Sequence, residues 1–180
     1  DAEQFRLDDD SVGKVKLAAN YNQRTGAVNF RGISENKDYQ FDLKGLYNIL
    51  DSVSDKQLDI VTSLNGTRIN LLKKYLNTVF SDVDGFATGQ LRIVGTGKNL
   101  NYLGKVNLKD GKLTVGYTNV TYTIPEANID FKEGLIDFGN IILKDSLNNV
   151  GMLSRGKLRH KSFNDMDFDF ALFSNKLLVL

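Results

Sequence analysis

The chain has no cysteine, one proline and one histidine among its 180 residues. Without cysteine it can form no disulfide framework, no zinc knuckle and no thiol nucleophile. Its 23 basic and 22 acidic side chains leave a net charge of +1, which argues against the concentrated basic surface of a nucleic-acid-binding protein. No apolar run approaches the roughly 20 residues that a membrane-spanning helix needs. The composition, 41% hydrophobic and 25% charged, is that of an ordinary folded protein.

Apolar and polar residues alternate over most of the sequence, which is typical of strands with one buried face. The single proline and the 16 glycines suit many strands joined by tight turns. The alternation slips near Gly139, where a bulge is expected. Strands are expected in the ranges 15–21, 28–30, 39–45, 58–64, 88–95 and 104–143.

Short polar motifs between these runs predict turns. Asp-Gly is a strong signal for a two-residue hairpin, because both central residues need positive φ. The sequence therefore predicts a hairpin at Asp110-Gly111, with Leu108 opposite Leu113. Further turns are expected at 23–26, at 133–134 and at 118–119, the last of which would set Tyr117 opposite Val120 and Val115 opposite Tyr122.

One segment breaks the alternation. Residues 67–80 carry apolar side chains at helical intervals, and Thr67 is a suitable N-cap. The pattern predicts one amphipathic helix of about three to four turns. Such a helix would either pack on a sheet or act as a lid over the open end of an apolar groove.

The last two strands are expected to form a hairpin with a turn near 162–164. In that register Lys157 faces Asp169 and Arg159 faces Asp167. Such exposed cross-strand pairs contribute about 0.2–1 kcal/mol each and help to set the register.

Signatures of an enzyme or a metal site are weak. His160 is the only histidine, and we interpret it as a structural residue at the edge of a packed face. Asp165, Asp167 and Asp169 alternate with apolar residues and lack the glycine and distal glutamate of a calcium loop. The motif at 95–98 resembles a phosphate loop only superficially, since the leading glycine and the following helix are missing. We expect no catalytic residues, no metal and no cofactor.

Many apolar side chains fall on one face of the predicted strands. That face is either the packed core of a β-sandwich or the lining of a ligand groove, and periodicity alone does not separate the two. The candidate lining residues are Val106, Leu108, Leu113, Val115, Tyr117, Val120, Tyr122, Ile124, Ile129, Phe131, Phe138, Leu158, Met166, Phe168, Phe170 and Leu172.

From about Asp84 onward the sequence resembles the C-terminal region of TamB-like proteins, the translocation and assembly module proteins of Gram-negative bacteria, in the form found in Bacteroidota. The order of several strand-and-turn motifs carries this resemblance, and no single motif is diagnostic. The motifs are residues 85–96, 102–111, 117, 122–125, 143–145, 156–165 and 168–170.

The resemblance implies a periplasmic protein that is anchored in the inner membrane by an N-terminal helix absent from this sequence. It implies an elongated β meander folded like a taco, with an apolar interior, and a role in outer-membrane biogenesis beside an outer-membrane assembly barrel. By similarity to AsmA-like proteins, it also implies movement of phospholipids between membranes.

We therefore expect one elongated β domain over 1–180, with strands in 1–66, a helix in 67–81 and strands in 84–180. The start at Asp1, which lacks the features of a signal peptide, and the apolar run at 177–180 suggest a fragment of a longer, repeat-like protein. Two functions stay open. One is an apolar groove that conducts or shields the acyl chains of phospholipids. The other is a scaffold or chaperone that assembles outer-membrane β-barrel proteins by strand pairing, without carrying lipid.

Overall fold

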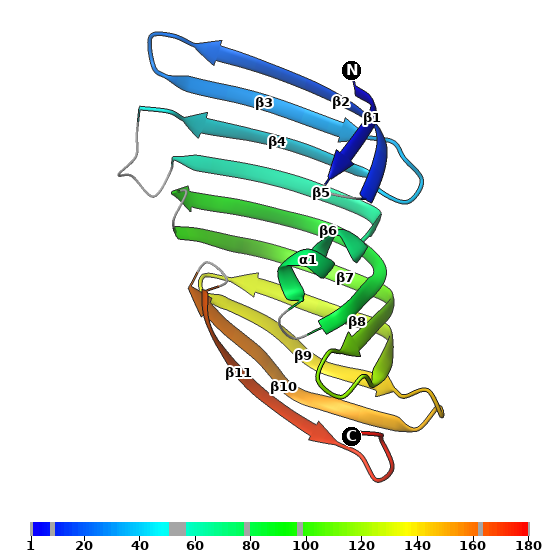
Figure 1. The fold of residues 1–180 in the computed structure, drawn as a ribbon. Coiled ribbons are helices and arrows are strands. Elements are labelled where there is room, and N and C mark those ends of the chain that lie inside the picture. The colour runs from blue at the N-terminus through cyan, green and yellow to red at the C-terminus, as the bar shows by residue number, and fades with distance from the viewer. Residues whose placement is uncertain are drawn as a thin grey trace.

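The protein forms a single open sheet. The structure, a computed structural model, describes residues 2–7, 10–50, 57–77, 80–96, 99–161 and 164–179. In these residues 11 strands lie side by side in sequence order, and every pair is antiparallel (Figure 1). The predicted β meander is thus confirmed. The strands are β1 (Ala2–Leu7), β2 (Asp10–Asn22), β3 (Ala27–Ser34), β4 (Phe41–Asn48), β5 (Leu58–Arg68), β6 (Phe80–Thr96), β7 (Asn99–Val115), β8 (Thr121–Lys132), β9 (Leu135–Lys144), β10 (Val150–Lys161) and β11 (Asn164–Phe173).

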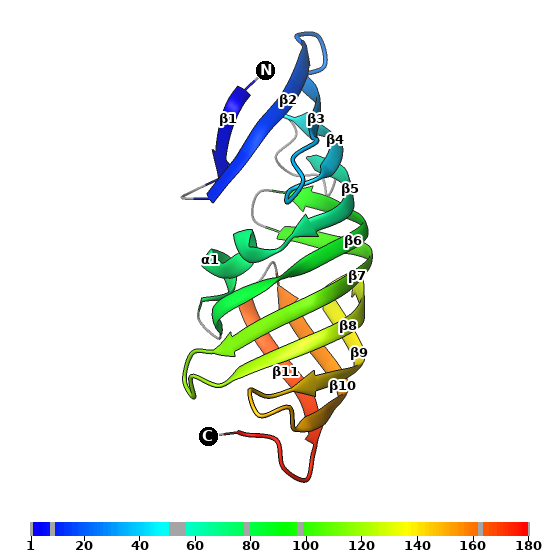
Figure 2. The same ribbon diagram turned by 90° about the vertical axis from the view of Figure 1, so that its right-hand side faces the viewer.

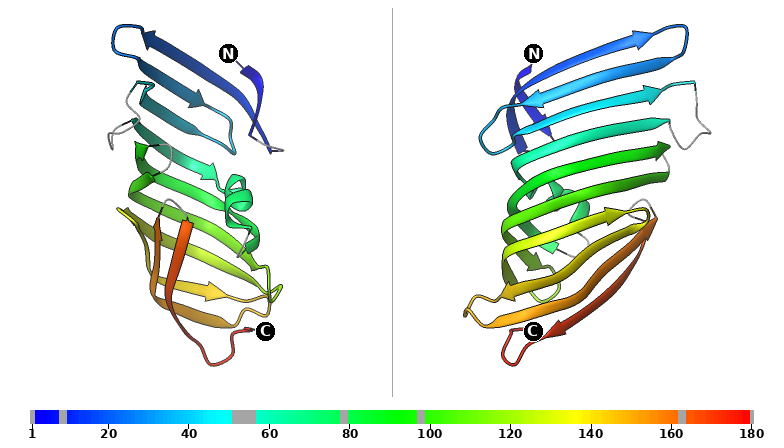
Figure 3. Two further views of the ribbon diagram at one scale, coloured as in Figure 1. Left: turned by 60° about the vertical axis from the view of Figure 1, so that its left-hand side comes forward. Right: turned by 180° about the vertical axis from the view of Figure 1, so that it is seen from behind.

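The sheet curves toward one of its faces. Seen from the side, β1 and the short helical segment lie on the hollow side, and β10 and β11 curl around below it (Figure 2). The two further views show the same arrangement, with β2 to β5 spread open and β8 to β11 curled together (Figure 3). We call the hollow side the concave face and define it by Val15, Phe41, Leu108 and Ala127.

Two apolar clusters lie on the concave face. Near β1, Val12, Val15 and Tyr39 are buried against Phe5, Phe41 and Leu71. In the curled part, Leu108, Ile124, Ala127 and Ile141 are buried, and partly buried side chains surround them. Burying one such aliphatic side chain contributes about 1.5–3 kcal/mol. Within the described residues, most members of these clusters come from the strands of the one curved sheet.

Bulges produce much of this curvature. A bulge adds one residue to a strand, bends it and reverses the alternation of its side chains. Residues three apart in a regular strand face opposite sides, yet Phe138 and Ile141 of β9 join the same cluster, as do Ile124 and Ala127 of β8. On β9 the change occurs at Gly139, which has φ of 60° and sits between two register shifts against β10. The bulge predicted at Gly139 is confirmed.

A short helical connection between β5 and β6, which we call the crossover, lies between the two clusters and contacts both. It consists of a 3-10 turn, η1 (Asn70–Leu72), and one helical turn, α1 (Lys73–Leu76). Ile69 packs against the cluster in the curled part, and Leu71 packs against the cluster near β1. The Ile69 N–H donates to the Gly85 carbonyl at 3.0 Å, so the crossover covers the edge of β6 where β5 has ended.

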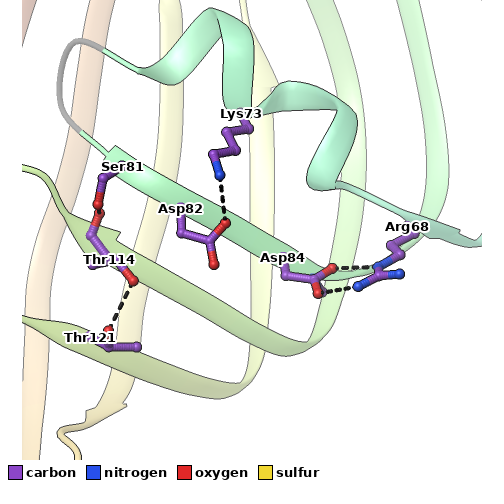
Figure 4. Close-up of polar contacts among 8 residues, drawn as sticks. Arg68, Lys73, Ser81, Asp82, Asp84, Thr114 and Thr121 are labelled. Atoms are coloured by element: carbon purple, nitrogen blue, oxygen red, sulfur yellow. Dashed lines mark hydrogen bonds and ion pairs between the residues drawn. The ribbon is translucent and has the colours of Figure 1, made fainter. Parts of the chain in front are cut away.

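Ion pairs hold the crossover in place (Figure 4). Arg68 donates to both carboxylate oxygens of Asp84 at 2.8 and 2.7 Å, and Lys73 lies 3.3 Å from Asp82. The hydrogen bonds from Arg68 hold the pKa of Asp84 below its ordinary value, and the same bonds raise the pKa of Arg68. This bidentate pair therefore anchors the point at which the chain leaves β5.

The helix predicted for 67–80 is wrong. Thr67 and Arg68 extend β5 and pair with Ala87 and Phe86 of β6, and only one helical turn forms within 73–76. Residues 78 and 79 lie outside the described part. The physical reason is that Thr67 serves the sheet and not a helix cap: its hydroxyl donates to the Gln40 carbonyl and accepts from the Asn65 N–H. Strand pairing thus overrides a weak helical preference.

The hairpin predicted at Asp110-Gly111 is also wrong. These residues lie inside β7, where Leu108 pairs with Ala127 and Gly111 pairs with Ile124 of β8. Asp110 has φ of 50°, and the register of β7 against β6 shifts between the pairs of Asp84 and Phe86. The positive φ that the motif favours is used here for a bulge and not for a turn.

The other turns lie where they are expected, with one change of register. Turns join β2 to β3 at 23–26 and β8 to β9 at 133–134. The β7–β8 connection occupies 116–120, but Tyr122 pairs with Leu113 and not with Val115, and Tyr117 lies in the loop. The shift is two residues, so Tyr122 keeps its expected face.

The register of the last hairpin is confirmed. Lys157 is opposite Asp169, and Arg159 is opposite Asp167 with 3.4 Å between Nη1 and Oδ2. Of the predicted turn, residues 162 and 163 lie outside the described part of the chain.

Glycine at position 104 should be essential for pairing β6 with β7. Gly104 has φ of 138°, and a Cβ there would lie 2.2 Å from the Gln90 carbonyl oxygen. We expect Gly104→Ala to lower the free energy of unfolding by more than about 3 kcal/mol, because it combines backbone strain with a clash. Gly139→Ala is the control: φ is 60°, no atom lies within 4 Å of the added Cβ, and the expected loss is about 1–2 kcal/mol. Equal losses in urea unfolding would contradict this account.

Candidate functional site

The most distinctive feature of the concave face is one row of apolar residues that crosses ten strands. Each member is the register partner of the next, from Leu17 on β2 to Phe168 on β11. We call it the apolar row. Thr62 is its only polar member, so apolar surface continues from strand to strand without a charge. The row is Leu17, Gly32, Leu43, Thr62, Leu91, Gly104, Phe131, Ile136, Leu158 and Phe168.

The neighbouring row on the opposite face has the reverse character. Nine of its ten members are polar or charged, and Ile33 is the exception. Lys105 lies 3.6 Å from Asp130 within it. We call it the polar row: Lys16, Ile33, Asp42, Ser63, Gln90, Lys105, Asp130, Asp137, Lys157 and Asp169. The sheet therefore has one face suited to apolar contact and one suited to water.

Burial along the apolar row is uneven. Leu158 in the curled part is 5% exposed, whereas Leu17 and Phe168 at the two ends are 56% and 42% exposed. Around Leu17 the concave face also exposes Tyr21 and Tyr47. Among the described residues the apolar face is thus open around these three side chains and closed where the sheet curls.

The predicted lining residues fall into three groups. Val106, Leu108, Tyr122, Ile124 and Leu158 are buried, and Leu113, Ile129 and Phe138 pack against the cluster in the curled part. Phe168, Phe170 and Leu172 lie along β11 and are 40–43% exposed, with Phe170 in edge-to-face contact with Phe138 and with Phe168. Val115, Val120, Phe131 and Met166 are partly exposed, and Tyr117 lies in the β7–β8 loop and is 93% exposed.

The prediction of lining residues omitted the first six strands of the sheet. Leu17, Tyr21, Phe30, Leu43 and Ile60 share the concave face with the predicted set. Their alternation with Lys16, Arg31 and Asp59 was a sufficient signal, because register carries a face from one strand to the next.

A buried carboxylate, that of Asp145, lies in the connection between β9 and β10. Asp145 accepts hydrogen bonds of 2.9 Å from the N–H groups of Leu147, Asn149 and Leu178 and from Nδ2 of Asn149. Burial alone would raise the pKa of Asp145, but these hydrogen bonds hold it below its ordinary value. The Tyr122 hydroxyl donates to the Leu178 carbonyl at 2.6 Å. These bonds fasten residues 174–179 across the ends of β8 to β10.

His160 lies in the curled part beside the β8–β9 turn. Its ring is 6.0 Å from that of Tyr102, centroid to centroid, and its N–H group on the backbone donates to the Gly134 carbonyl at 3.0 Å. Burial lowers the pKa of its imidazole below 6.5. In the described residues no group of three or more His, Asp or Glu side chains could hold a metal ion. His160 therefore behaves as part of the packed face.

Two surface hollows lie along β2 and β3. One of about 620 Å³ adjoins the β2–β3 turn at 20–24, and one of about 310 Å³ is lined by Lys14, Lys16, Ile33, Glu35 and Asn36. Among the described residues no helix has both the length and the apolar character needed to cross a membrane. The arrangement offers an extended apolar surface and not an enclosed polar pocket.

Comparisons with protein-family models, with curated proteins and with solved structures find no match to this chain.

The stability of the fold should depend on pH through His160. Because its folded pKa lies below 6.5, the unfolded chain binds the proton more readily. The free energy of unfolding should hold steady above about pH 7 and fall as the pH drops through 6.5 toward the folded pKa. His160 is the only histidine, so His160→Leu should remove this slope in urea unfolding series. An unchanged slope in the variant would show that another group is responsible.

Proposed function

We propose that this chain is a segment of a TamB-like protein and that its concave face carries the acyl chains of phospholipids between the inner and outer membranes of a Gram-negative bacterium. In this proposal the protein works in the periplasm, is anchored through a helix outside this sequence, and meets an outer-membrane assembly barrel. It catalyses no chemical step and needs no cofactor.

The apolar row is the observation that supports this proposal. Ten strands each contribute an uncharged residue in register, and the opposite face carries the polar row. Exposing an acyl chain of about 16 carbons to water costs on the order of 10 kcal/mol. Contact with the apolar row offsets the cost of exposing the acyl chain to water. The row must carry no charge, because an acyl chain that covers one unpaired charge costs several kcal/mol.

The open and closed parts of the face fit the same role. An acyl chain needs access from solvent or membrane, and β2 to β4 expose Leu17, Tyr21 and Tyr47. It also needs shelter from water, which the curl of β8 to β11 supports through the cluster around Leu108. Nothing in this mode of binding requires convergent polar groups, and the apolar row has only Thr62.

Photo-crosslinking from neighbouring positions tests the proposal. A photoreactive residue at Leu17 or Leu91 on the concave face should form adducts with phospholipid in vesicles of phosphatidylethanolamine and phosphatidylglycerol. The matched positions Ala18 and Gln90 lie next in sequence on the opposite face and should form few or none. Mass spectrometry of the digested protein gives the ratio of lipid adducts at each concave position to those at its matched position.

Circular dichroism and thermal unfolding would control for folding of each labelled protein. Equal labelling on both faces, or no labelling at Leu17 and Leu91 in folded protein, would refute lipid binding by this face.

A further inference from the structure

The edge strand β11 presents a patterned edge for strand pairing. It bonds to β10 on one side, and among the described residues no strand pairs with its other side. An edge strand offers alternate backbone N–H and C=O groups to a further strand. Its length, from Asn164 to Phe173, suffices for a strand of ordinary length.

The two faces of β11 differ sharply in chemistry. Phe168, Phe170 and Leu172 face the concave side and remain 40–43% exposed, whereas Leu158, the partner of Phe168 on β10, is 5% exposed. Asp167 and Asp169 point to the opposite face, as does Asp165 by its place in the alternation. An added strand would bury the aromatic side chains and bring its own side chains beside the aspartates.

Charges elsewhere in the sheet indicate which side chains would fit. Strand neighbours on the polar face repeatedly join opposite charges: Arg31 with Asp42 at 2.7 Å, Arg92 with Asp59 at 2.7 Å, and Lys132 with Asp137 at 3.6 Å. Among the described residues, Lys157 and Arg159 of β10 are the register partners of Asp169 and Asp167. A strand on the free side would continue the pattern if it carried lysine or arginine.

We infer that β11 binds an extended segment of another polypeptide in which apolar side chains alternate with lysine or arginine. The segment adds a twelfth strand, with its apolar side chains beside Phe168 and Phe170 and its basic side chains beside Asp167 and Asp169. The inference is independent of lipid carriage, because it concerns the edge of the sheet and its test contains no lipid.

The test uses two fluorescent ten-residue peptides, one alternating valine with lysine and one alternating valine with glutamate. Fluorescence anisotropy with the whole 180-residue chain should give tighter binding of the lysine peptide by about three- to tenfold at low salt. Asp167→Asn combined with Asp169→Asn should bring the ratio close to one. Glu35→Gln combined with Asp38→Asn changes the net charge equally at exposed sites beside β3 and β4 and should leave the ratio of the two affinities unchanged.

Disulfide trapping locates the peptide. The chain has no cysteine, so Ala171→Cys on the aspartate face of β11 gives a unique thiol. Trapping by peptides with cysteine at successive positions should peak at every second position, as strand pairing requires. The proposal is overturned if neither peptide binds, if both bind equally to the unaltered chain, or if trapping lacks this period. It is also overturned if sedimentation shows that a second copy of the chain occupies β11.

Discussion

A sheet with no second layer must bury its apolar face by its own curvature, and most of this structure follows from that constraint. In the described part of the chain, eleven strands in sequence order form one surface, and a crossover of one 3-10 turn and one helical turn lies beside them. The curled half satisfies the constraint through the cluster around Leu108, Ile124 and Ile141. The open half does not, so Leu17 and Tyr21 remain exposed.

Curvature of this kind demands irregular backbone at defined places. Positive φ at Asp110 and Gly139, and the absence of a side chain at Gly104, let long strands bend while their pairing continues. The bulge at Gly139 also reverses the side-chain alternation of β9, which allows Phe138 and Ile141 to enter one cluster. The charges on the opposite face then fix register from strand to strand, from Arg31 with Asp42 to Arg159 with Asp167. The same arrangement that shapes the fold produces the apolar row.

Alternation in the sequence predicts the strands, the β class and the register of the last hairpin, because these depend on local patterns that tertiary contacts reinforce. It fails at Asp110-Gly111, since a positive φ serves a bulge as well as a turn. Only the neighbouring strands decide between them: the register of β6 shifts between Asp84 and Phe86, and Ile124 of β8 pairs with Gly111. It fails again at Thr67, whose hydroxyl is engaged by Gln40 from a distant strand. The apolar row could not be predicted from the sequence either. Alternation shows that each residue is on the apolar face, but which residues lie side by side depends on the register of ten strands.

The central claim is that the concave face binds phospholipid, and native mass spectrometry tests it most directly. Leu17→Asp with Tyr21→Asp places two charges on the open part of that face, and Ala18→Asp with Asn20→Asp places two on the opposite face of the same strand, all at exposed sites. After incubation with phosphatidylethanolamine, the unaltered chain and the Ala18/Asn20 variant should retain adducts of phospholipid mass, and the Leu17/Tyr21 variant should lose most of them. Absence of adducts on the unaltered chain, or equal retention by both folded variants, would contradict the account.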